Sequence, residues 1–265
     1  MDDPLVHNLL AALTLAPATL WVLWGRPEKN ALFWILFLFA ASGPFVMCIS
    51  LVQAGWETGF AAALWMTISG CMAVFLLLAA TTRDMHRLSC LLMHYLLILS
   101  LSAAIWGCTS LHILQGQPPA WIVLHIATSV LTYVLLTLAA IASAAVVIHE
   151  GALRRKKRFP VLDKLPSAAD SERLELRLLL ASEVVLGLGI ISGMAVQYLL
   201  DGAVLSFDHK TLFSFLAFIV IGALLIAHYR IGLRGRQAAR VVLVGYLLVT
   251  LGYPGVKFVT DVLIG

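Results

Sequence analysis

Charged side chains are scarce in this sequence: Asp, Glu, Lys and Arg make up only 12% of its 265 residues. Soluble domains carry about 25%. Alternating strand-like patterning is also absent, which argues against a membrane β-barrel. Apolar residues make up 61% of the chain and its mean hydropathy is +0.96. These values leave no room for a sizeable soluble domain and predict an all-α, polytopic membrane helix bundle.

Several chemical motifs are missing. The four cysteines form no CxxC, CxxCH or zinc-type spacing, so the sequence indicates no disulfide framework, covalent haem attachment or zinc site. We find no paired general acid and base, no nucleophile constellation and no phosphate-binding loop. The net charge of +4 is explained by basic loops at a membrane surface and does not indicate nucleic-acid binding. The sequence therefore gives no positive sign of an enzyme.

Eight apolar runs are each long enough for a bilayer, which needs about 20 helical residues. The acidic start, Asp2-Asp3, is unlike a signal peptide, so the first run is predicted to be a retained helix. The predicted spans are residues 5–24, 31–53, 60–80, 90–112, 120–149, 178–200, 211–229 and 241–263. We treat them as one transmembrane domain, with four divergent helices in residues 1–115 and four in residues 116–265.

Basic residues divide unequally between the two sets of loops. One set holds sixteen Lys and Arg residues and the other holds only Lys210 and Lys257. Cytoplasmic loops carry the excess of Lys and Arg in membrane proteins. Both termini are therefore predicted to face outward, with the basic loop at residues 150–177 in the cytoplasm.

Histidines are the main candidates for chemistry, because eight of them occur in so apolar a chain. Histidine is a common ligand of haem iron and other metals. The predicted topology puts half of them near the outer face (His7, His112, His125, His209) and half near the inner face (His86, His94, His149, His228). His125 and His228 differ in predicted depth by roughly 18 Å, so one iron cannot take both.

Partners for these two histidines must come from the same leaflet. His94 and His149 are candidates for His228, whereas His112, His7 or a methionine such as Met47 are candidates for His125. An interfacial histidine can also simply bond a loop carbonyl or a lipid head group.

Two features of the predicted sixth helix are unusual in a span. Glu183 is costly inside a bilayer, and we expect it to face the bundle in an ion pair with Arg177, Arg230 or an inner histidine. Gly189 and Gly193 form a GxxxG pattern, which favours close helix packing.

From about residue 120 onward the chain resembles the cytochrome c assembly protein family, in particular its short CcsA/HemX-like inner-membrane branch. The matching segments are LHIATSVLTYVLLTLAA, SERLELRLLL, DHKTLFSFLAF, AHYRIGLRGRQAAR and VGYLLVTLGYPGVKFV. The resemblance implies haem as cofactor, with His125 on a flanking outer histidine and His228 on a membrane histidine of an inner haem site. Cytochrome c maturation proteins are the partners it implies, besides the lipid bilayer.

The chain also departs from the family pattern. It has no tryptophan-rich WWD motif, and no histidine follows GYPGVKFV. Met47 falls where related proteins often have a histidine. Lys210 and Lys257 outside, and Arg230 and Arg234 inside, could pair with haem propionates.

Three functional hypotheses follow. The first is a membrane haem-binding or haem-handling protein of cytochrome c assembly. The second is a non-catalytic scaffold or regulator that kept the fold, lost haem chemistry and docks partners through the basic run at residues 154–158. The third is a small transporter, but the sequence shows neither the internal repeats nor the pair of proline-broken helices that are typical of transporters.

Overall fold

The computed structural model describes residues 4–25, 27–53, 55, 59–107, 119–156, 159–201 and 209–264. These residues are overwhelmingly helical and contain no strand. Eight helical stretches are long and apolar enough to cross a membrane, which confirms the predicted all-α polytopic class. They are Leu5–Trp24, Ala31–Gln53, Phe60–Thr81, Met85–Ile105, Ala120–Arg155, Ala168–Leu199, Thr211–Ile231 and Gly235–Leu263. The orientation of the termini stays a prediction.

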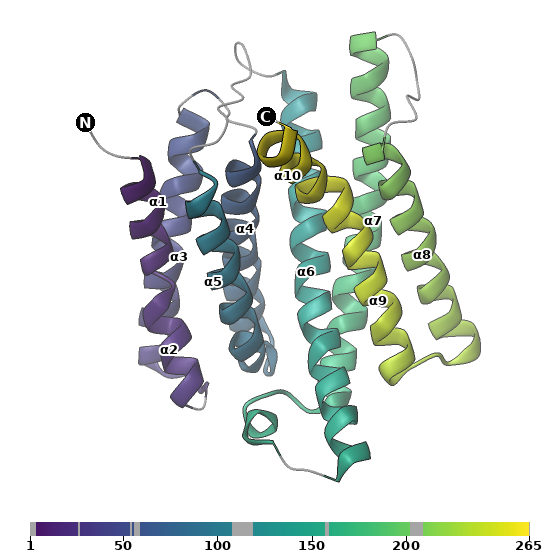
Figure 1. Cartoon of the computed structure of the whole chain (residues 1–265). Coiled ribbons are helices and arrows are strands. Elements are labelled where there is room, and N and C mark those ends of the chain that lie inside the picture. Colours follow the sequence, from purple (N-terminus) through teal and green to yellow (C-terminus); the bar gives the residue numbers. More distant parts are fainter. Residues whose placement is uncertain are drawn as a thin grey trace. The chain divides into compact units, whose positions relative to one another are not determined.

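The chain forms two compact units (Figure 1). Unit 1 comprises residues 1–117, 158–166 and 257–265, and unit 2 comprises residues 118–157 and 167–256. The elements of unit 1 are α1 (Pro4–Leu13), α2 (Ala16–Trp24), α3 (Ala31–Gln53), α4 (Phe60–Thr81), the 3₁₀ turn η1 (Met85–Leu88), α5 (Ser89–Ile105), η2 (Pro160–Asp163), α10 (Val256–Phe258, shared at its first residue) and the π-helix η4 (Val259–Ile264). Those of unit 2 are α6 (Ala120–Arg155), α7 (Ala168–Asp201), α8 (His209–Ile231), α9 (Gly235–Thr250) and the π-helix η3 (Leu251–Gly255).

Unit 1 accommodates a proline in the middle of a membrane helix. Pro44 in α3 has no N–H to offer the carbonyl of Ala40, four residues earlier. The Thr14 hydroxyl lies 3.4 Å from that carbonyl. The carbonyl of Pro44 accepts a 2.7 Å hydrogen bond from Ser69 of α4. The Thr14 hydroxyl donates mainly to the carbonyl of Ala11, at 2.7 Å, so the hydrogen bond from Ser69 is the strong side-chain contact at this proline.

The C-terminal segment is attached to α4 of unit 1 by a buried carboxylate. Asp261 is only 8% exposed, and its Oδ2 accepts a 2.9 Å hydrogen bond from the N–H of Phe60, the first residue of α4. A carboxylate is favourable at a helix N-terminus, where N–H groups lack intrahelical acceptors. Thr260 donates to the other carboxylate oxygen at 2.8 Å. Asp261 therefore caps a helix that begins 201 residues earlier in the chain.

Replacing Asp261 by alanine should destabilise unit 1 by about 1–2 kcal/mol, the usual cost of losing a side-chain cap. Thermal unfolding of the detergent-solubilised protein measures this as a lower Tm. Asp261→Asn retains an acceptor and should lose less. Equal Tm values for wild type and Asp261→Ala would show that the cap contributes nothing.

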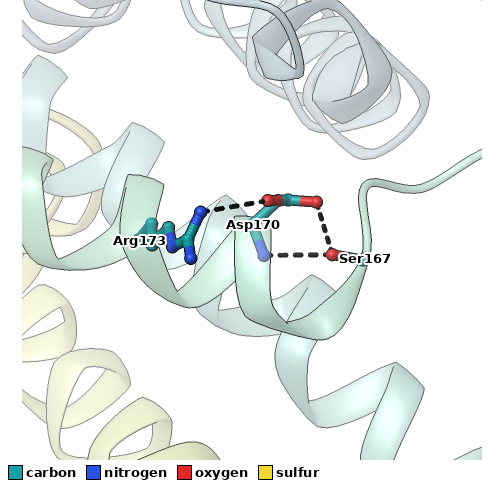
Figure 2. Close-up of polar contacts among 3 residues, drawn as sticks. All are labelled: Ser167, Asp170 and Arg173. Atoms are coloured by element: carbon teal, nitrogen blue, oxygen red, sulfur yellow. Dashed lines mark hydrogen bonds and ion pairs between the residues drawn. The ribbon is translucent and has the colours of Figure 1, made fainter.

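The helices of unit 2 begin and end differently from the predicted spans. α7 starts at Ala168, ten residues before the predicted span. Ser167 caps this start: its Oγ accepts the N–H of Asp170 at 3.1 Å and donates to Asp170 Oδ2 at 2.5 Å, and Arg173 pairs with Asp170 at 3.9 Å (Figure 2). α6 likewise continues six residues past its predicted end.

Within unit 2, α7 packs against α6 and α8, and α9 packs against α6 and α8, so the four helices enclose a common interior (Figure 1). α6 supplies the most buried stripe. Tyr133 is 1% exposed and its ring stacks on that of Tyr246 with centroids 5.7 Å apart. The Tyr133 hydroxyl lies 3.3 Å from both Tyr246 Oη and Thr250 Oγ1.

Candidate functional site

A cavity of about 310 Å³ lies inside unit 2, between α6, α7, α8 and the end of α9 with η3. Its size is at the lower end of the range for small-molecule sites, about 300–1,000 Å³. Apolar side chains from α7 and α8, such as Ile190, Met194 and Phe215, form much of its wall. Hydroxyl and amide groups contribute at a few points. His125 is the lining residue with the strongest affinity for metals.

The GxxxG pattern on α7 positions His125. A Cβ atom at Gly193 would lie 2.9 Å from Cε1 of His125, so only glycine lets the imidazole approach this closely. At Gly189, by contrast, a Cβ would be 3.8 Å from Thr128 Oγ1, an ordinary contact. The predicted close helix packing is confirmed, and at Gly193 it also determines where the imidazole of His125 lies.

Ser192 fixes the tautomer of His125. Its Oγ donates to the carbonyl of Gly189 at 3.0 Å, so its single hydroxyl proton is used. The same Oγ lies 3.1 Å from Nδ1 of His125, so with its own proton on the Gly189 carbonyl it is placed to accept the Nδ1–H. The lone pair of the imidazole is then on Nε2. Histidines that bind metals are held in this way, with the second nitrogen donating to an oriented acceptor.

One wall of the cavity is formed by an irregular helix, the π-helix η3. α9 passes at Leu251 into the π-helix η3, where the N–H of Val256 donates to the carbonyl of Leu251, five residues back. Pro254 lies inside this turn and supplies no N–H. Gly252 and Tyr253 of η3 line the cavity. Such π-turns occur frequently at functional sites.

His228 lies apart from this cavity. It is 14 residues beyond Ser214, a lining residue of the same helix, or roughly 21 Å along α8. This agrees with the expectation that one iron cannot take both histidines. Nδ1 of His228 donates to the carbonyl of Leu233 at 3.0 Å, beside the left-handed residue Gly232 (φ 68°) that ends the helix. Its lone pair is also on Nε2.

The other predicted ligands are distributed over the two units. In unit 1, His94 is half-buried in α5 and donates from Nδ1 to the carbonyl of Cys90 at 2.5 Å, whereas Met47 is half-buried in α3. Lys257 belongs to α10. Lys210 is in the first turn of α8, next to the cavity residue Thr211, but its side chain is outside the described part of the structure. His112 falls outside the described residues.

Clusters of metal-ligating side chains and ion pairs are scarce among the described residues. Within the described ranges, no three His, Cys, Asp or Glu side chains come together as a protein-ligated metal site would require. The sole ion pair among those residues joins Asp170 and Arg173, so the pair expected for Glu183 is not formed there. The reason is positional: Glu183 is 15 residues into α7, where no cation of a described side chain reaches it.

The sequence comparisons place this architecture in a family. Residues 28–264 match the family described as cytochrome C assembly protein. The chain belongs to the cytochrome c assembly protein family. The match begins in unit 1, so the likeness covers far more than the segment from residue 120 that the sequence motifs indicated. No solved structure matches the chain.

Relatives of this family member differ in how much of the chain they cover. A protein of Azospirillum brasilense, named "Uncharacterized 28.8 kDa protein in nifR3-like 5'region", is 46% identical over the full length of both chains. Two proteins named "Cytochrome c biogenesis protein CcsA", from Prochlorococcus marinus strains MIT 9301 and AS9601, are 28% and 27% identical. They align with 57% and 52% of this chain, which spans only 55% and 51% of their own lengths.

Proposed function

We propose that this protein is an integral membrane haem-binding protein that handles haem in cytochrome c biogenesis, in a bacterial inner membrane, with His125 as an iron ligand. Family membership supports the role in biogenesis. The single observation that carries the haem proposal is the orientation of His125: a cavity-lining imidazole whose Nδ1–H is held by Ser192, leaving the Nε2 lone pair for iron.

The residue types around the cavity suit a haem, although the cavity volume of about 310 Å³ would take only part of the macrocycle. Its macrocycle is apolar and suits the side chains that line the cavity, and its propionates need polar or basic partners. Ser214 and Thr211 are polar lining residues at the start of α8, next to Lys210. His125 would hold the iron and Lys210 is proposed to meet a propionate. When bound, haem would supply a redox-active iron porphyrin, and the chain itself would bind, orient and shield it.

A second site is proposed at His228. Its Nδ1–H is held by the Leu233 carbonyl in the same manner, which supports Nε2 as a further ligand for haem. Because His228 is far from the cavity along α8, the two proposed haem sites would lie at different depths in the membrane.

Absorption spectra of the purified protein test the proposal. In the ferric and dithionite-reduced states, we expect a Soret band and, on reduction, sharper visible bands, with haem and iron in equal amounts. Protein without bands should acquire them on addition of haemin. No bands after reconstitution with haemin would contradict the proposal and favour the scaffold hypothesis, in which the basic run at residues 154–158 recovers a partner.

Ser192→Ala should weaken haem affinity about 10–100-fold, the usual effect of removing a group that orients a ligand. Haemin titration measures the affinity, and the reduction midpoint potential should shift because the imidazole loses its acceptor. Ser192→Thr retains the hydroxyl and should restore both properties. If Ser192→Ala and Ser192→Thr behave alike, Ser192 does not position His125.

A further inference from the structure

Glu183 occupies a niche that a glycine creates. It is 15 residues from the start of α7, or roughly 22 Å along the helix. Its Oε1 lies 3.0 Å from the place where a Cβ of Gly222 in α8 would be. Its Oε2 has almost no accessible surface and no hydrogen-bond partner among the described residues. A carboxyl group is thus packed against the backbone of the neighbouring helix.

The helices around α7 carry other titratable or charged groups, but none is paired with Glu183 within the described structure. On α6 those groups are His125, Tyr133, His149, Glu150, Arg154 and Arg155, and on α8 they are His228, Tyr229 and Arg230. On α9 they are Arg236, Arg240 and Tyr246, and on α7 itself Asp170, Glu172, Arg173, Glu175, Arg177 and Tyr198. Glu183 is half-buried within a membrane-spanning stretch, where an unpaired carboxylate is costly. The surroundings therefore favour the neutral, protonated acid.

Glu183 is on the same face of α7 as the cavity. Leu186, Ile190 and Met194 line the cavity and follow Glu183 by three, seven and eleven residues, which is the spacing of one helix face. Only about 4.5 Å of helix rise separates Glu183 from Leu186. The carboxyl group itself lies at the level of Gly222, which is seven residues, or roughly 10 Å, along α8 from the lining residue Phe215.

A proton suits this niche better than a metal ion. Hard cations need about six oxygen ligands. The niche presents one carboxyl and a glycine backbone, and no cluster of three potential ligands exists among the described residues.

We propose that Glu183 is a proton-binding site whose protonation is linked to occupancy of the cavity by an anionic ligand. The link between Glu183 protonation and cavity occupancy rests on the proposed function, because we take the anionic ligand to be haem, which carries two propionates. Loss of the proton places a negative charge on the cavity-facing side of α7, roughly 10 Å along α8 from Phe215, and weakens binding of an anion. By reciprocity, a bound anion makes Glu183 hold its proton more tightly.

Labelling with dicyclohexylcarbodiimide, which adds to protonated carboxyl groups in apolar surroundings, tests the proton site without haem. Mass spectrometry of the labelled protein in lipid nanodiscs should locate the adduct at Glu183. Glu183→Gln should remove this adduct, and Glu150→Gln, whose carboxylate instead accepts the N–H of Arg236 at 3.0 Å, should leave it unchanged. A wild-type protein labelled elsewhere but not at Glu183 would overturn the proposal.

Two glycine substitutions test the niche. Gly222→Ala places a methyl group against the carboxyl and should reduce labelling of Glu183 several-fold. Gly187→Ala alters the same α7–α8 interface, but its methyl would meet the Phe218 ring at 3.3 Å, so labelling should persist. Equal labelling of the two variants would contradict the niche.

Haemin titration across pH tests the linkage. Above the pH at which Glu183 releases its proton, wild-type affinity should fall by up to about tenfold per pH unit, as for one linked proton. Glutamine mimics the neutral acid, so Glu183→Gln should stay at the high affinity there. Parallel profiles for the two proteins would overturn the linkage. Adduct formation without any haem binding would instead disprove the proposed function and retain the proton site.

Discussion

Alanine at His125 should abolish haem binding in the cavity, with affinity for haemin reduced at least about 100-fold. Groups that merely orient a metal ligand contribute 10–100-fold, and removal of the ligand itself should cost no less. The half-buried imidazole is directed by Ser192 and packed against Gly193, so the substitution removes the strongest donor that lines the cavity. Loss of the Soret band, followed during haemin titration, measures the effect.

The matched control is His149→Ala, which removes a histidine from the same helix without touching the cavity lining. It should bind haemin like the wild type. His228→Ala separates the two proposed sites: a partial loss of haem alongside an intact cavity signal would assign a second site to His228. Unchanged spectra in His125→Ala would contradict His125 as an iron ligand.

The membrane helices could be predicted from the sequence because each depends on a local property, a run of about 20 apolar residues. Their ends were less predictable. α7 begins ten residues early because Glu and Arg are good helix formers and Ser167 caps them, yet charged residues lower the hydropathy that marks a span. The end of α6 was missed for the same reason.

The site was only partly visible in the sequence. His125 could be identified by resemblance to the family, and the GxxxG pattern signalled close packing at Gly193. Ser192 could not be identified, because its contact with His125 depends on the antiparallel register of α6 and α7. Tyr253 lies in the π-turn η3 and lines the cavity. The proline and glycines of the segment GYPG indicate an irregular turn, but the hydropathy pattern predicts a continuous span there.

The second large effect is expected from a substitution at Gly193, which is in contact with His125. Gly193→Ala should destabilise unit 2 by about 1 kcal/mol, the low end of the range for overpacking, because the imidazole borders the cavity and can turn into it. The added methyl group would lie 2.9 Å from Cε1 of His125, so the imidazole must move and lose its hydrogen bond to Ser192. A lower Tm of the haem-free protein measures the destabilisation, and weaker haemin binding should accompany it.

Gly189→Ala provides the matched control, since the same substitution in the same motif meets Thr128 only at an ordinary 3.8 Å. Its Tm should equal or exceed that of the wild type, because alanine favours helix more than glycine does. A double-mutant cycle identifies the cause: with His125→Ala already present, the methyl at position 193 has no imidazole to displace, and its destabilising effect should largely vanish. If Gly193→Ala costs the same in both backgrounds, the backbone of α6, and not the imidazole, is what requires glycine at position 193.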